Sequence, residues 1–161
     1  MQHILDFIVP DTLDRAMLVV GSSIGAVVSF CFGGWTPGLT WLGAMAGVDF
    51  VLGSFAAWRT GEWNSDAGAQ GVKRKVALFA FIAIAHGIDV TLAEGGMDIL
   101  SFMSMTVTAL TVTEAGSIVE NIDRMGCGHL IPPVIRRGLK SAREAVDKRL
   151  NEKLGTEAKD G

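Results

Sequence analysis

Residues 16–34 decide the fold: they read AMLVVGSSIGAVVSFCFGG and contain no charged side chain. A helix rises 1.5 Å per residue, so about 20 apolar residues cross the roughly 30 Å of hydrocarbon in a bilayer. The stretch follows Arg15 and ends at the helix-breaking sequence WTPG, residues 35–38. The sequence therefore predicts a membrane-spanning helix over residues 16–34.

Three further apolar stretches of similar length follow, at residues 39–58, 76–93 and 99–119. The composition agrees with a membrane protein, because 49% of the residues are hydrophobic and 19% are charged, against roughly 25% charged residues in globular domains. We therefore expect an all-α, polytopic membrane protein with about four transmembrane helices. We divide the chain into an N-terminal cytoplasmic or interfacial segment (1–15), a four-helix transmembrane domain (16–121), and a cytoplasmic turn with a basic amphipathic helix (122–161).

The positions of the cations predict the topology, because short cytoplasmic loops carry an excess of Lys and Arg. Of the 14 Lys and Arg residues, Arg15 precedes the first stretch, and Arg59, Lys73, Arg74 and Lys75 lie between the second and third. All the others follow the fourth stretch. Both termini should then be cytoplasmic, in a multi-pass membrane protein. The first ten residues contain no Lys or Arg, unlike a cleavable signal peptide, so we expect the N-terminus to be retained.

Small residues recur along the first two predicted spans. Lipid gives helices no hydrophobic reason to associate, so membrane helices pack closely where small residues let their backbones approach. This pattern is compatible with packing inside one four-helix monomer or with packing between the subunits of a homo-oligomer. The candidate helix-packing and oligomerisation residues are Gly21, Gly25, Ser29, Gly33, Gly43, Gly47 and Gly53.

Acidic residues inside the spans are the main candidates for function. Asp49 lies near the centre of its span, where an Asp costs roughly 3 kcal/mol on the insertion scale. Its helical face also carries Gly53, so a neighbouring helix can come close there. No Lys or Arg lies within any predicted span, so we expect these acids to be protonated, hydrogen-bonded or hydrated, either as structural polar contacts or as a water-lined surface. The full set of intramembrane polar candidates is Asp49, His86, Asp89, Glu114, Ser117 and Asn121.

Catalysis and cofactor binding find no support in the sequence. The chain has no HExxH, GxSxG, CxxC or Walker pattern. His129 and Cys127 are two possible metal ligands where a site needs three or four. We therefore expect a protein that is not an enzyme and has no cofactor, no metal site and no nucleic-acid partner.

The tail after Pro132-Pro133 has apolar residues at helical spacing and predicts one helix ending at Gly155. Its other faces are basic, which suits either a solvated surface or contact with anionic lipid headgroups. The candidate lipid-facing residues, including those of the loop between the second and third spans, are Lys73, Arg74, Lys75, Arg136, Arg137, Lys140 and Arg143.

Several short segments together resemble the phage holin family grouped with the clostridial toxin-secretion holins. DFVLGSFAA at residues 49–57 is similar to their D-x-x-x-G-x-x-A-A segment, and EAGSIVEN at 114–121 to their E-x-x-S-I-x-E-N. The other matching elements are Ser65 followed by GVKRK at 71–75, the intramembrane Asp89, and the G-x-x-hydrophobic-P turn within residues 126–132. The resemblance covers roughly residues 45–150.

The resemblance implies an inner-membrane protein that oligomerises into holes and releases a lytic enzyme or a toxin. Its partners would be copies of itself, membrane lipids and, functionally, an endolysin or secreted toxin. From the residues alone, two alternatives stay open. One is a small ion channel or proton-coupled transporter that uses Asp49, His86, Asp89 and Glu114 as a relay. The other is a membrane scaffold whose tail helix recruits a partner.

Overall fold

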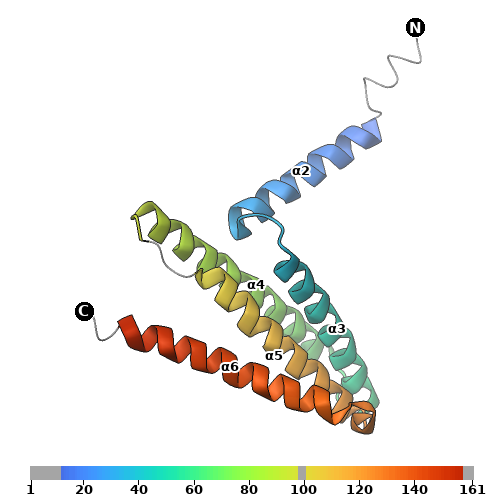
Figure 1. The fold of residues 1–161 in the computed structure, drawn as a ribbon. Coiled ribbons are helices and arrows are strands. Elements are labelled where there is room, and N and C mark those ends of the chain that lie inside the picture. The colour runs from blue at the N-terminus through green and yellow to red at the C-terminus, as the bar shows by residue number, and fades with distance from the viewer. Residues whose placement is uncertain (1–11, 98–100, 158–161) are drawn as a thin grey trace. The chain divides into compact units, whose positions relative to one another are not determined.

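The computed structural model describes residues 12–97 and 101–157 (Figure 1). Its helices are α2 (Thr12–Phe32), α3 (Pro37–Arg59), α4 (Ser65–Glu94), α5 (Phe102–Arg124), the short 3-10 helix η1 (Gly128–Leu130) and α6 (Pro133–Glu157). Across these two ranges the chain forms no strand. Helices α2 to α5 each contain a segment long and apolar enough to cross a membrane. The predicted all-α fold with four membrane-capable helices is therefore confirmed.

The chain forms two compact units, residues 1–35 and residues 36–161. In the first unit the described helix is α2, and its apolar side chains, such as Leu18 and Phe30, are largely exposed. Two of its hydroxyls, those of Ser22 and Ser23, bond within the helix by donating to the carbonyl of Val19. This local bonding suits a helix in lipid, where no water can pair with a hydroxyl.

The second unit is organised around α5. Helices α3, α4 and α6 each pack on it, and α3 and α4 contact one another much less (Figure 1). Helix α3 runs parallel to α5, since a Cβ on Gly38 would lie 3.3 Å from Val107 near their starts and one on Gly53 would lie 3.2 Å from Asn121 near their ends. Helix α4 runs the opposite way (Figure 1).

Local sequence explains the start of α3. Thr36 is its N-cap, and the backbone N–H of Leu39 donates to the Thr36 hydroxyl at 3.2 Å. Pro37 occupies the first helical turn, where the missing N–H costs nothing. The WTPG breaker therefore begins α3, as predicted. Helix α2 ends two residues earlier than predicted, at Phe32, because Gly33 and Gly34 adopt positive φ.

Helix α4 begins earlier than its apolar sequence suggests. It starts at Ser65, so Lys73, Arg74 and Lys75 lie on the helix and the connection from α3 is residues 60–64. The prediction that these three cations belong to a loop is wrong. The apolar stretch marks where a helix can enter lipid, and the helical backbone continues through the polar residues before it.

The turn before α6 is fixed by a fork of hydrogen bonds. The Arg136 guanidinium donates to both carboxylate oxygens of Asp123, at 2.8 and 2.6 Å, and to the carbonyl of Gly128 at 3.1 Å. These contacts raise the pKa of Arg136, first through the hydrogen bond and then through the charge of Asp123. A Cβ on Gly128 would clash with the Asp123 carboxylate, so a larger residue there would displace the fork. The predicted tail helix is confirmed as α6, and its half-buried Leu139 reaches the α5 surface at Gly116.

Candidate functional site

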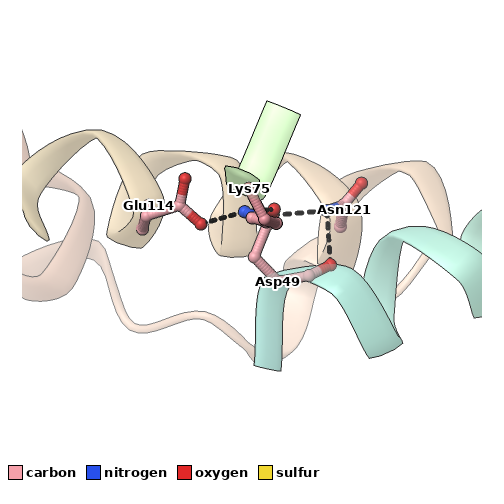
Figure 2. A network of polar contacts seen from close by, with 4 residues as sticks. All are labelled: Asp49, Lys75, Glu114 and Asn121. Atoms are coloured by element: carbon pink, nitrogen blue, oxygen red, sulfur yellow. Dashed lines mark hydrogen bonds and ion pairs between the residues drawn. The ribbon is translucent and has the colours of Figure 1, made fainter. Parts of the chain in front are cut away.

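Three of the membrane-capable helices meet at a cluster of charged and polar side chains (Figure 2). We call this the charge cluster: Asp49 of α3, Lys75 of α4, and Glu114 and Asn121 of α5. The Lys75 ammonium donates to Asp49 Oδ2 at 2.6 Å and to Glu114 Oε2. The Asn121 amide donates to Asp49 Oδ1 at 2.9 Å. One lysine therefore joins carboxylates from two other helices.

The charge cluster is largely removed from solvent. Glu114 is 2% exposed, Asp49 is 7% exposed, and the Lys75 side chain is 15% exposed. No buried side-chain nitrogen or oxygen among the described residues lacks a hydrogen-bond partner. With all three groups ionised, two negative charges share one positive charge, so the cluster has a net charge of −1. Burying ions costs several kcal/mol per ion unless pairing and hydrogen bonds compensate, so the cluster depends on the pairing of Lys75 with both carboxylates.

The sequence places these side chains together through buried stripes that alternate steps of three and four residues. On α4 the stripe runs Lys75, Leu78, Ile82, Ala85 and Asp89. Such spacing keeps one helical face toward a partner, so Lys75 points inward because it continues the apolar face by one more step. That face is the signal by which the sequence could have identified Lys75.

Two expectations from the sequence are therefore wrong. Lys75 does not face lipid, because it is held between Asp49 and Glu114. Those two acids are also neutralised in part by an ion pair, contrary to the expectation that no basic side chain reaches them. Both errors have the same cause, namely that α4 carries Lys75 inside the helix, immediately before its apolar part.

The expected close approach beside Asp49 is confirmed. Gly53 lies one turn after Asp49 and leaves room for Asn121, whose amide nitrogen would be 3.2 Å from a Cβ on Gly53. Ala56, one turn further, is fully buried. Small residues on α3 thus let α5 come near enough for Asn121 to reach the Asp49 carboxylate.

Comparison with known proteins identifies the family. The bacteriophage holin family matches residues 26–144 of the chain. The chain belongs to the bacteriophage holin family. Holins are membrane proteins without enzymatic activity, so the chain is a multi-pass membrane protein of that kind.

Uncharacterized bacterial proteins are similar to this holin-family protein over most of their length. A protein of Halalkalibacterium halodurans is 43% identical over 105 residues, which cover 64% of this chain and 77% of the relative. A protein of Listeria innocua is 31% identical over 112 residues, covering 70% of this chain and 76% of the relative. A protein of Listeria monocytogenes is 30% identical with the same coverage. No solved structure matches the holin chain significantly.

A second polar site in this holin-family protein lies at the other end of the α4 stripe. The Asp89 carboxylate accepts hydrogen bonds from the Ser101 hydroxyl at 2.7 Å and from the backbone N–H groups of Phe102 and Met103 at 2.6 and 3.0 Å. These N–H groups belong to the first turn of α5, where backbone N–H groups have no acceptor within their own helix. His86 lies within electrostatic range of Asp89. Asp89 therefore caps α5 from the neighbouring helix.

The two polar sites are separate. Lys75 and Asp89 are 14 positions apart on α4, or about 21 Å at 1.5 Å per residue. The side chains between them on this face are the buried Leu78, Ile82 and Ala85. The four residues of the suggested relay thus fall into two groups with an apolar segment between them.

The remaining sequence candidates differ in their surroundings. A Cβ on Gly43 or Gly47 would meet no atom within 4 Å, so these glycines do not bring helices together inside the second unit. Ser117 is half-buried next to the charge cluster. The other basic candidates are exposed, and their lipid contact remains a prediction: Lys73, Arg74, Arg136, Arg137, Lys140 and Arg143. No group of three or more potential metal ligands occurs among the described residues.

Proposed function

We propose that this holin-family protein oligomerises in the bacterial inner membrane and forms holes through which a lytic enzyme or a toxin leaves the cytoplasm. The charge cluster is the observation that carries the proposal. It places three charged side chains at the contact between three membrane-capable helices. A protein that only had to stay in the membrane would be better served by apolar residues of similar volume, since these often stabilise a core as well as a buried ion pair does.

The physical argument rests on hydration. In the closed bundle the three charged side chains of the cluster carry a desolvation cost, because they are largely removed from solvent. In a water-filled hole the same side chains would be hydrated, so opening recovers part of that cost. The apolar core that opposes opening is small, because among the described residues its largest fully buried side chains are those of Leu42 and Ile82. Closed and open arrangements can therefore be close in free energy, as a two-state device requires.

Helix α2 supplies a surface for assembly in this proposal. Gly21, Gly25 and Ser29 form a ridge of small residues along it, while Gly33, the last residue of the predicted ridge, follows the helix end at Phe32 with a positive φ. Such ridges favour close helix contacts in lipid. Replacing Gly25 with leucine adds bulk to the ridge while keeping the helix apolar, so insertion should persist. We expect Gly25→Leu to block higher-order assembly and hole formation together. Val27→Leu adds bulk to the same helix away from the ridge and is the matched control.

Release of cargo tests the proposal directly. The protein is expressed with a folded cytoplasmic reporter enzyme, and enzyme release, ion leakage and crosslinked oligomers are measured in the same cells. Wild type and Val27→Leu should release the enzyme and form large oligomers, whereas Gly25→Leu should do neither at equal expression. Leakage of ions without any enzyme would overturn hole formation in favour of a small channel. A Gly25→Leu variant that still assembles and releases enzyme would refute the role of the ridge.

The proposed topology has both termini in the cytoplasm, in agreement with the sorting of the cations. The two free cysteines report on it without any substitution. A membrane-impermeant thiol reagent should label Cys127 in inside-out vesicles, and Cys31 should resist labelling from either side. Labelling of Cys127 in intact cells would contradict this topology. The neighbouring gene would identify the class of cargo: a peptidoglycan hydrolase gene would indicate a lytic enzyme, and a toxin gene would indicate a toxin.

A further inference from the structure

Two adjoining cavities form a groove in the second unit, the first lined by α3, α4 and α5 and the second by α3 and α4. The first, of about 330 Å³, lies beside the charge cluster and is lined by Trp63, Arg74 and Glu120 among others. The second, of about 480 Å³, is lined almost entirely by apolar groups, including Gly43 and Gly47. Phe50 and Lys75 line both cavities. Both volumes fall within the roughly 300–1,000 Å³ of small-molecule sites.

The two cavities follow one another along the helices. The first is lined by the residues where α3 and α5 end and α4 begins, such as Ala57, Gly68 and Arg124. The second lies deeper along the spans, between Gly43 of α3 and Phe79 of α4. A ligand that fills both must therefore be charged at the helix ends and apolar toward their middle.

The first cavity is lined by one basic and one acidic side chain that form no ion pair with another described residue. Lys75 is bound to Asp49 and Glu114, and Arg124 is paired with Glu62 at 2.7 Å. Arg74 and Glu120 take part in none of the ion pairs found among the described residues. An arginine binds a phosphodiester well, and a carboxylate binds an ammonium group.

We propose that this groove binds one phospholipid whose headgroup carries both a phosphodiester and an ammonium group, as in phosphatidylethanolamine. Arg74 binds the phosphate, Glu120 binds the ammonium group, and one acyl chain occupies the apolar cavity. Gly43 and Gly47 keep that cavity open, because a Cβ on either would stand in free space in the groove. This assigns the two glycines to a lipid, whereas the sequence suggested contact between helices.

Native mass spectrometry of the full-length protein in mild detergent tests the proposal. Phosphatidylethanolamine and phosphatidylglycerol with identical acyl chains are added at equal concentrations, and the lipids retained per protein are counted. The wild type should retain one phosphatidylethanolamine in preference to phosphatidylglycerol. Arg74→Gln should weaken retention of both lipids about tenfold, the effect of losing one charge-assisted hydrogen bond. Glu120→Gln should remove the preference for the ammonium headgroup.

The apolar cavity is tested by filling it. Gly47→Leu places a side chain where the acyl chain would lie and should reduce retention at least tenfold, with the protein still helical and monodisperse. The matched controls are Arg59→Gln, which removes an exposed charge at the end of α3 that lines neither cavity, and Gly87→Leu, which adds leucine at a glycine of α4 with open space around it. Both controls should retain lipid as the wild type does.

Several results would overturn the lipid site. Equal retention of the two lipids by the wild type would remove the role of Glu120. Unchanged retention in Gly47→Leu would remove the acyl cavity. Competition by free phosphoethanolamine as strong as that by the lipid would make it a headgroup site without a tail. A lipid-free dimer that Gly47→Leu dissociates would assign the groove to a second copy. None of these measurements requires a hole, so they stand apart from the test of cargo release.

Discussion

The two ends of the buried α4 stripe hold acids in different ways. Asp89 is held at one end by a hydroxyl and two backbone N–H groups that lie 12 to 14 positions away in the chain. At the other end, Asp49 and Glu114 are held by Lys75, over separations of 26 and 39 positions. Breaking the Asp89 contacts removes the acceptor of two first-turn N–H groups of α5, while the Ser101 hydroxyl still caps the helix by accepting from the Ser104 N–H. Breaking the Lys75 contacts needs a change in how whole helices pack, and so the Lys75 end is the one suited to switching.

Among the variants that compare the Lys75 and Asp89 ends of the stripe, we expect Lys75→Met to have the largest effect on stability and lysis. This variant leaves two buried carboxylates without their cation, and removing one partner of a buried ion pair costs about 3–5 kcal/mol. The closed bundle should unfold at a lower temperature in detergent, and cells should lyse early or contain less protein. Lys73→Met, at an exposed position two residues away, should behave as wild type. A Lys75→Met protein as stable as Lys73→Met would show that the ion pairs contribute nothing.

Asp89→Ala tests the opposite end. It removes the acceptor for the first-turn N–H groups of α5 and should cost about 1–2 kcal/mol, as the loss of a helix cap does. Thermal unfolding should shift by a few degrees, and the time of lysis at equal expression should stay the same. Asp66→Ala, in the exposed first turn of α4, is the control. If Asp89→Ala changed lysis timing as much as Lys75→Met, the claim that only the Lys75 end of the stripe is suited to switching would be wrong.

Gly53→Ala is a smaller perturbation of the charge cluster. In a helix, alanine is favoured over glycine by up to about 1 kcal/mol, but here the added methyl would press on Asn121 and weaken its bond to Asp49. We expect no net gain in stability from Gly53→Ala, whereas Gly87→Ala, with open space around it, should stabilise. Equal gains in stability at both positions, measured by thermal unfolding, would show that α5 accommodates the added methyl group without weakening the bond between Asn121 and Asp49.

Asp49→Asn should change stability least. It keeps the shape of the side chain and leaves Lys75 paired with Glu114 alone, so the cluster becomes neutral. A neutral cluster gains less from hydration, and hole formation should therefore come later although the protein still inserts. Lysis timing at matched expression measures this, and unchanged timing would reduce Asp49 to a packing residue.

Much of the fold could be predicted because its determinants are local. Apolar length, the WTPG breaker and the Pro132-Pro133 boundary each act within a few residues, and the helices follow them. The candidate acids could also be identified, since a carboxylate inside an apolar stretch is evident from its cost. Their partners could not. Lys75 lies immediately before an apolar stretch, and hydropathy alone assigns such a residue to the preceding loop. The cap between Asp89 and the start of α5 depends on how the chain turns between the helices, which hydropathy does not encode.

The order of residues along α5 has a consequence for register. Val107, Glu114 and Asn121 follow one another at seven-residue intervals on the face toward α3 and α4. Apolar stripes alone would tolerate a slip of one heptad, about 10.5 Å along the axis. Such a slip would put Val107 or Asn121 where Glu114 now meets Lys75, and the charges would no longer match. The cluster thus permits one alignment of the three helices, as single buried polar residues do in coiled coils, and a helix that leaves this alignment must find the same partners in another copy or meet water.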